Sequence, residues 1–154
     1  MDTIYRRSRR IVVWLGLKDS SSDLALSTLT YIGAQIEWTQ ENWRIRSPDA
    51  EQVDWYKSRY ALPYDQGTFD AILQLLRRPW FDRLWVMQEI QLSNKFAIVQ
   101  CGKNQVPWSL FRRGILCLRN KVGLSRELFE RSRHVSDVAH ACSKVHKLAL
   151  AQAL

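Results

Sequence analysis

An indole and a carboxylate one helical turn apart are the residues of this sequence best suited to chemistry. Trp85 and Glu89 lie in the stretch Arg77 to Glu89, which also holds two further large aromatic residues and a proline. On a helix, their i and i+4 spacing places both side chains on one face. Packing against the indole would remove hydration from the carboxylate, which suits it to proton transfer or to stabilising a developing cation. The alternative reading, favoured on the residues alone, is a salt bridge from Glu89 to an arginine.

A proline separates the elements that must position this pair. Pro79 fixes its own φ and biases the preceding residue away from helical geometry, so a helix capped by Thr68 is predicted to end near Arg77. Asp82 can cap a second helix that runs to about Gln91. That second helix would carry both Trp85 and Glu89.

The other residues of this stretch have structural interpretations. Trp80 and Phe81 are predicted to belong to the core, as are Trp14 and Trp108, because of their positions beside strands and helix starts. Arg78 and Arg83 could bind a phosphate. Since the sequence has no Gly-x-Gly-x-x-Gly loop, we favour ion pairs for these two arginines.

The elements on either side alternate between strand and helix. The apolar runs Ile11 to Leu15 and Lys95 to Cys101 predict two parallel strands, the first buried on both faces. Between them, the spacing of apolar residues predicts a helix that is capped by one of the serines at 20–22 and extends as far as Trp38. The first strand and this helix form the first half of a βαβ unit. Residues 39–67 lack a sustained apolar period, which predicts a long insertion with one short helix near 50–59.

The last third of the chain is predicted to be helical. A turn at 102–104 and Pro107 precede a helix on which Trp108, Phe111, Ile115 and Leu118 recur at helical spacing. From Ser125 onward, apolar residues near a heptad seam predict a long amphipathic helix. We therefore divide the chain into residues 1–120 and a helical extension, 121–154.

Composition limits the class of protein. The chain has 154 residues, 46% of them hydrophobic, enough for one domain with a core. No run of about 18 to 20 apolar residues could form a transmembrane segment, and the first residues lack the apolar core of a secretion signal. Location in the cytoplasm is the expectation.

The titratable residues form no recognisable metal or nucleophile site. Three cysteines and three histidines lack the spacing of metal ligands, so we expect reduced, mostly buried thiols. Of the net charge of +8, the whole excess lies beyond residue 90, where 11 basic and 3 acidic residues occur. Such a tail can bind nucleic acid or an anionic membrane. A solvated helix face is the preferred interpretation, so no specific nucleic-acid partner is predicted.

The central stretch also carries a resemblance to a known family. Pro79, Trp80, Phe81, Arg83, Trp85, Gln88 and Glu89 match the pattern Arg-x-Trp-Phe-x-Arg-x-Trp-x-x-Gln-Glu, the most recognisable block of the fungal heterokaryon incompatibility (HET) domain. Two flanking blocks agree with this family in order and spacing. The first is Ile4-Tyr5 followed by residues 11–16, and the second is Cys101-Gly102 with Val106 and Trp108. Earlier blocks of the family, including a strand with Ser-Tyr and Trp-Gly, do not occur here. The chain therefore resembles the C-terminal half of a HET domain, a truncated form.

The resemblance implies a fold and three possible roles. HET domains are similar to Toll/interleukin-receptor domains, which implies a partial flavodoxin-like α/β sheet flanked by helices. It also implies fungal nonself recognition and programmed cell death, signalled through protein partners or self-association. The alternatives are an enzyme that cleaves NAD, in which Glu89 is catalytic at the ribose, and an inactive remnant; no cofactor other than NAD as a substrate is implied.

Overall fold

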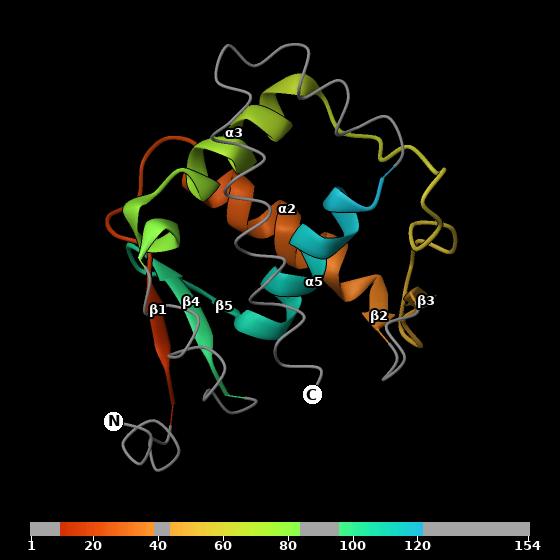
Figure 1. Ribbon diagram of the computed structural model, residues 1–154, viewed down its shortest axis with the longest axis horizontal. Helices are drawn as coiled ribbons and strands as arrows, with labels where there is room; N and C mark the ends of the chain where they lie inside the picture. The colour runs from red at the N-terminus through yellow and green to blue at the C-terminus, as the bar shows by residue number, and fades with distance from the viewer. Residues whose placement is uncertain (1–9, 39–43, 84–95, 122–154) are drawn as a thin grey trace.

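Two strands from distant parts of the chain pair in parallel and form the centre of a small sheet. In the computed structural model, which describes residues 10–38, 44–83 and 96–121, β1 (Val12–Trp14) pairs with β4 (Ile98–Cys101), and Val13 lies opposite Val99. The sheet order is β1-β4-β5 (Figure 1). The predicted parallel pair is confirmed, and so is the α/β class.

The third strand corrects the sequence analysis. β5 (Asn104–Pro107) runs antiparallel to β4, so the sheet is mixed rather than wholly parallel. The predicted turn is present, because Gly102 adopts the left-handed φ of +58° that reverses the chain. Residues 104–107 are predicted only as the end of a turn and the approach to a helix, because three of the four are polar or proline and Val106 alone favours a strand. The flavodoxin-like arrangement stays a prediction.

Three helices pack together beside the sheet. These are α2 (Ser22–Ala34), α3 (Gln66–Leu76) and α5 (Trp108–Arg119), as Figure 1 shows. α3 begins earlier than predicted, because Asp65 rather than Thr68 is its N-cap and accepts a 2.8 Å hydrogen bond from the Thr68 N–H. Within the described ranges, no helix has both the length and the apolar character that a bilayer crossing requires.

α2 and α5 cross with their backbones almost in contact. A Cβ placed on Gly33 would lie 1.9 Å from the carbonyl oxygen of Leu110, and one on Gly114 would lie 2.1 Å from that of Leu29. Such distances are far inside van der Waals contact, so only glycine fits at either position. Glycine in a helix costs about 1 kcal/mol relative to alanine. The packing contacts made possible by the close approach of the two helices offset this cost.

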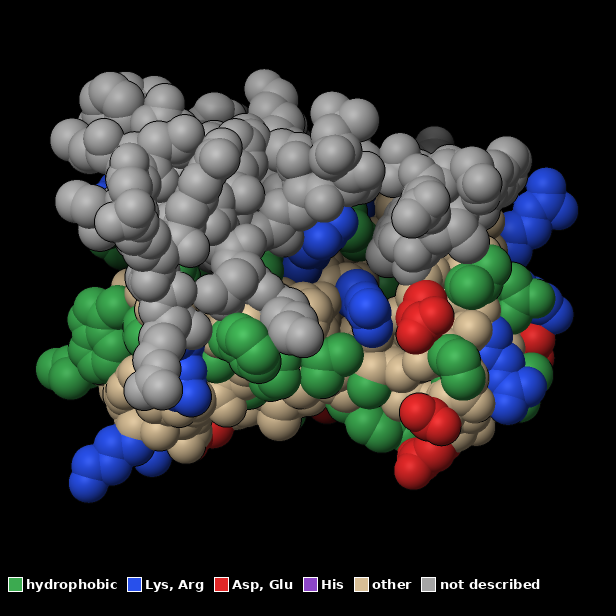
Figure 2. Space-filling model, turned by 90° about the horizontal axis from the view of Figure 1, so that it is seen from below, with side chains coloured by type: hydrophobic (Ala, Val, Ile, Leu, Met, Phe, Trp, Pro, Cys, Tyr) green, Lys and Arg blue, Asp and Glu red, His purple; other side chains and the backbone are tan. Residues whose placement is uncertain are grey.

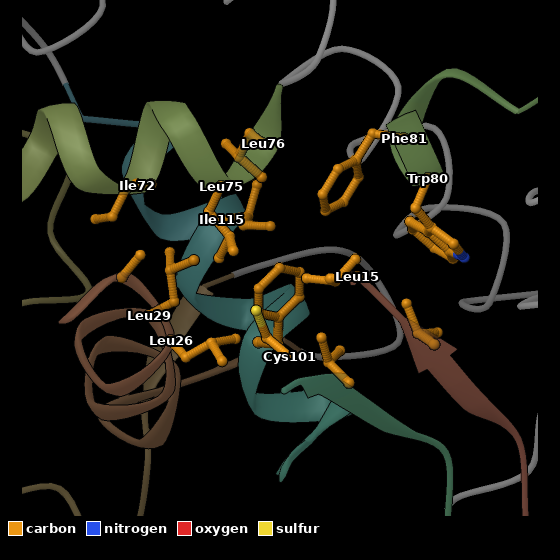
Figure 3. Packing of buried hydrophobic residues seen from close by; sticks show 14 of the residues in the cluster. Leu15, Leu26, Leu29, Ile72, Leu75, Leu76, Trp80, Phe81, Cys101 and Ile115 are labelled. Carbon is orange, nitrogen blue, oxygen red and sulfur yellow. The ribbon is translucent and has the colours of Figure 1, made fainter. Parts of the chain in front are cut away.

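The side chains between the helices and the sheet form the larger apolar cluster, which we call the motif cluster. Its buried members are Val13, Leu15, Ala25, Leu26, Leu29, Ala71, Ile72, Leu75, Leu76, Trp80, Phe81, Ala97, Val99, Cys101, Trp108, Phe111 and Ile115. Figure 3 shows most of these side chains. Burial alternates along β1 and the residue after it: Val13 and Leu15 are buried, whereas Val12 and Trp14 are 47% and 48% exposed. The predictions that this strand is buried on both faces and that Trp14 is a core residue are therefore wrong.

A second, smaller cluster lies at the opposite end of α2. We call it the loop cluster, and it consists of Ile32, Ile36, Trp55 and Cys117. β2 (Ile36–Trp38) pairs antiparallel with β3 (Arg44–Arg46), so the helix predicted to continue to Trp38 ends at Ala34 instead. Residues 50–59 form turns rather than the predicted short helix. The long C-terminal helix predicted from Ser125 lies outside the described residues.

Candidate functional site

The chain turns sharply at Pro79. Arg78, which follows the end of α3, is extended (φ −62°, ψ 145°), and the single 3₁₀ turn η1 (Pro79–Asp82) begins immediately afterwards. The predicted end of the helix near Arg77 is confirmed. The predicted helix start at Asp82 is wrong, because Asp82 is the last residue of the 3₁₀ turn and Arg83 is extended (φ −76°, ψ 128°).

Arg78 joins this turn to the carboxyl end of β1. Its Nη1 donates to the carbonyl oxygens of Leu15 at 2.8 Å and Leu17 at 2.7 Å, and its Nη2 forms a 2.9 Å ion pair with Asp19. The Arg78 side chain is only 14% exposed. The predicted ion-pair role of Arg78 is confirmed, and the guanidinium fixes the path of the chain as it leaves the sheet.

Gly16 makes room for this guanidinium. It adopts φ +98°, which disfavours any residue with a Cβ, and a Cβ there would lie 3.4 Å from Nη1 of Arg78. The carbonyl oxygen of Gly16 accepts a 2.8 Å hydrogen bond from the N–H of Gly102, at the turn after β4. The loops at the carboxyl ends of both parallel strands are thus tied together.

Asp19 links the arginine to the start of α2. Its Oδ1 accepts hydrogen bonds of 2.9 Å from the N–H groups of Ser21 and Ser22 and from the hydroxyl of Ser21. The hydrogen bonds from Ser21 are the main reason that the pKa of Asp19 lies below its usual value, and the charge of Arg78 lowers it further. Ser21, one of the three serines predicted to cap α2, is its N-cap residue, but its side chain makes no capping hydrogen bond. The Asp19 carboxylate accepts from the N–H groups of Ser21 and Ser22 instead.

The polar groups at this edge of the sheet bind one another. Open α/β sheets commonly hold ligands beyond the carboxyl ends of their parallel strands. Here Asp23 pairs with Lys18 at 3.4 Å and accepts a hydrogen bond from the side-chain amide of Asn104. Because Arg78 and Asp19 also satisfy each other, the chemistry of these described residues is that of a structural clamp.

The two aromatic residues after Arg78 enter the motif cluster. Trp80 is 7% exposed and Phe81 is 2% exposed. The Phe81 ring lies 5.0 Å from that of Trp80, edge to face, and 6.4 Å from that of Phe111, stacked. Figure 3 shows both rings among the side chains of β1, α3 and α5. The predicted core roles of Trp80 and Phe81 are confirmed, and Trp108, 3% exposed, also fits its prediction.

Comparison with known families agrees with the resemblance found in the sequence. The sequence model of the family described as "Heterokaryon incompatibility protein (HET)" matches residues 1–89, more than half of the chain. The chain belongs to the HET family. The matched range ends at Glu89, so it includes the whole Arg78 to Phe81 segment that closes the motif cluster.

A curated relative supports membership of the HET family. "Heterokaryon incompatibility protein 6, OR allele" from Neurospora crassa is 27% identical over 117 residues, which cover 66% of this chain. They cover 17% of the length of that relative, so the chain spans a small part of it. No solved structure matches the chain.

The remaining residues of the HET block divide between the surface and the part of the chain that is not described. Pro79 and Arg83 are exposed. Trp85, Gln88 and Glu89 lie outside the described residues, as does any contact between Arg83 and Glu89. The predicted indole–carboxylate pair, and NAD as a substrate, therefore stay predictions.

The cysteines fit their predicted role where the structure describes them. Cys101 and Cys117 are free, buried thiols. Burial raises the pKa of Cys117 to about 11, so this thiol stays protonated at neutral pH and is no nucleophile. Within the described ranges, no group of His, Cys, Asp and Glu could hold a metal ion; Cys142 and the three histidines lie outside them.

Sequence reasoning missed a buried lysine that holds the loop cluster. Lys121 is 3% exposed, and its ammonium donates to the carbonyl oxygens of Trp55 at 2.6 Å and Lys57 at 2.7 Å. It also lies 5.8 Å from the centre of the Tyr60 ring. Burial lowers the pKa of Lys121, and the nearby charge of Arg44 lowers it too. A lysine that directly follows an apolar helix is the only sequence signal, and it is a weak one.

Proposed function

We propose that this chain acts in fungal heterokaryon incompatibility, as part of a protein that detects nonself and triggers programmed cell death. The match of the HET family to residues 1–89 carries this proposal. The relative from Neurospora crassa, named for heterokaryon incompatibility, supports it. The activity of the whole protein is part of the proposal, because the chain spans only 17% of that relative.

The described half of the HET block favours a role through protein contacts. Arg78, Trp80 and Phe81 are used for clamping and packing, so these residues build a scaffold rather than a reaction centre. On the outer face of β1, Val12 and Trp14 remain about half exposed. A protein partner or a second copy of the chain would cover apolar surface of this kind.

Inducible expression in a filamentous fungus tests the proposed function. We expect the natural chain to reduce growth and viability, and Phe81→Ala to abolish the effect by disrupting the motif cluster. Arg77→Ala is the matched control, because Arg77 is exposed and next to the same turn. Growth unaffected by the natural chain at detectable protein levels would contradict the proposal.

The variant Glu89→Gln separates contact from catalysis in the same assay. If the chain signals through protein contacts alone, Glu89→Gln kills as the natural chain does. Loss of killing together with loss of NAD consumption, at unchanged protein level and melting temperature, would instead support the NAD-cleaving alternative. Light scattering of the purified chain, compared with Trp14→Ser, tests whether the exposed face of β1 supports self-association.

A further inference from the structure

A basic hollow lies at the β3 end of the molecule, away from the HET block. Its volume is about 370 Å³, within the size range of small-ligand pockets. The residues that line it are Arg44, Tyr56, Lys57, Ser58 and Arg59. Figure 2 shows several Lys and Arg side chains at this end of the molecule, on the right, next to a smaller number of Asp and Glu side chains. Three of the five lining residues carry a positive charge, and none is acidic.

Only one of these three cations is neutralised by a described carboxylate. Lys57 forms a 2.6 Å ion pair with Asp54. Arg44 donates only to a neutral group, the carbonyl oxygen of Asn120 at 3.4 Å. Arg59 makes no hydrogen bond or ion pair with any described residue. Two guanidinium groups beside one hollow therefore keep unbalanced charge.

A further positive charge, that of Lys121, lies behind the turn that lines the hollow. The buried ammonium of Lys121 holds the carbonyl oxygens of Trp55 and Lys57, so it fixes the turn that presents Lys57, Ser58 and Arg59. None of the described carboxylates forms an ion pair with Lys121. The charge of Arg44 is one of the causes that lower the pKa of Lys121, and an anion in the hollow would reduce the repulsion between these two cations.

We propose that this hollow binds a phosphate group carried by a small molecule or a lipid headgroup. Arg44 and Arg59 supply the planar, multiply donating groups that suit phosphate oxygens, and the Ser58 hydroxyl adds a neutral donor. The phenol ring of Tyr56 lines the same hollow and offers a flat apolar surface to the part of the ligand that carries the phosphate. This inference goes beyond the proposed function and does not depend on it.

Calorimetry with inositol hexakisphosphate, a soluble polyphosphate, tests the site. We expect binding at low salt that weakens as salt is raised, and a loss of at least about tenfold in affinity for Arg59→Gln, about 1.4 kcal/mol. Arg77→Gln is the matched control, because it removes the same charge from an exposed position at the end of α3. Equal losses in the two variants, or no binding by the natural chain, would overturn the proposal.

A second arm distinguishes the source of the phosphate. Sedimentation with phosphatidylcholine vesicles that contain about 10 mol% phosphatidylinositol 4-phosphate reports binding to a lipid headgroup. Recovery of the natural chain but not of Arg59→Gln with the vesicles would assign the site to lipid. Binding of the soluble probe without vesicle recovery would assign it to a free phosphorylated molecule. Unchanged melting temperatures of both variants confirm that folding is intact.

Discussion

The motif cluster and the loop cluster are stabilised by different physical means. The motif cluster holds 17 buried apolar residues from both parallel strands, the three helices and the turn after α3. The loop cluster holds four, and its central residue, Trp55, comes from a segment of turns. Its backbone carbonyl accepts from the buried ammonium of Lys121, and its ring lies edge to face with Tyr31 and Tyr64.

The difference shows how a segment without regular structure can be held in place. The motif cluster is stabilised mainly by apolar burial spread over many residues, and the Arg78 clamp adds a polar contribution at its edge. The turns at 54–60 have few such contacts, so their carbonyl groups need specific donors. One buried cation supplies two of these donors, and the loop cluster is accordingly the more sensitive region to the loss of one polar side chain.

The largest effect is expected from Phe81→Ala, which breaks the motif cluster. Truncating this ring leaves a cavity between Trp80 and Phe111, and we expect the free energy of unfolding to fall by about 3–5 kcal/mol. Urea denaturation followed by tryptophan fluorescence measures the change. Trp14→Ala is the control, since a half-exposed ring on the outer face of β1 should cost much less. Similar losses in both variants would show that the two faces of the sheet are equally buried.

A smaller but local effect is expected from Lys121→Met in the loop cluster. The change leaves two carbonyl oxygens without donors, which should cost about 2 kcal/mol. Hydrogen exchange measured by mass spectrometry should speed up over residues 47–60 while β4 keeps its protection. The exposed Lys103→Met serves as control. Faster exchange throughout both regions would mean that the two clusters unfold as one unit.

Arg78→Lys should destabilise the edge of the motif cluster by about 1–2 kcal/mol. A lysine cannot donate at once to the carbonyl oxygens of Leu15 and Leu17 and to the Asp19 carboxylate. Thermal melting compares it with Arg77→Lys, which changes an exposed neighbour and should be nearly neutral. If both variants melt like the natural chain, the clamp contributes nothing measurable.

The smallest effect is a change in acid sensitivity through Asp19. The pKa of Asp19 is lowered in the folded chain by its hydrogen bonds from Ser21, so the unfolded chain binds more protons. The stabilisation is present above the unfolded pKa, near pH 4, and is lost as pH falls through the lower folded value. Asp19→Asn should flatten the dependence of melting temperature on pH between about 5 and 3. An unchanged slope would assign the acid sensitivity to other groups, such as Asp65, whose pKa is lowered by Thr68.

The sequence was sufficient to predict the elements whose pattern is set by local apolar spacing. β1, β4 and α5 lie close to their predicted positions, and the interruption at Pro79 follows from the geometry of proline alone. The carboxylates that accept from the first N–H groups of α2 and α3 were not predicted, because each helix start offers several candidate side chains. Asp19 and Asp65 were chosen by backbone geometry that residue type does not reveal.

Burial and long-range pairing could not be predicted in the same way. Tryptophan is a residue type common in protein cores, but the exposure of Trp14 depends on what covers the outer face of the sheet. Lys121 and Trp55 are 66 positions apart, and no periodicity connects them. The residues of the basic hollow likewise come from β3 and the turns, so only the folded chain shows that their charges share one site.

The close crossing of α2 and α5 has a consequence for synthesis in the cell. Gly33 and Gly114 can meet only after the ribosome has added the 81 residues from Ala34 to Gly114, at roughly 5–20 residues per second. Until then α5 cannot pack against α2 at Gly33. β4, the parallel partner of β1 in the described sheet, is also synthesised late. The apolar face of α2 that packs against α5 therefore stays uncovered by α5 for several seconds during translation.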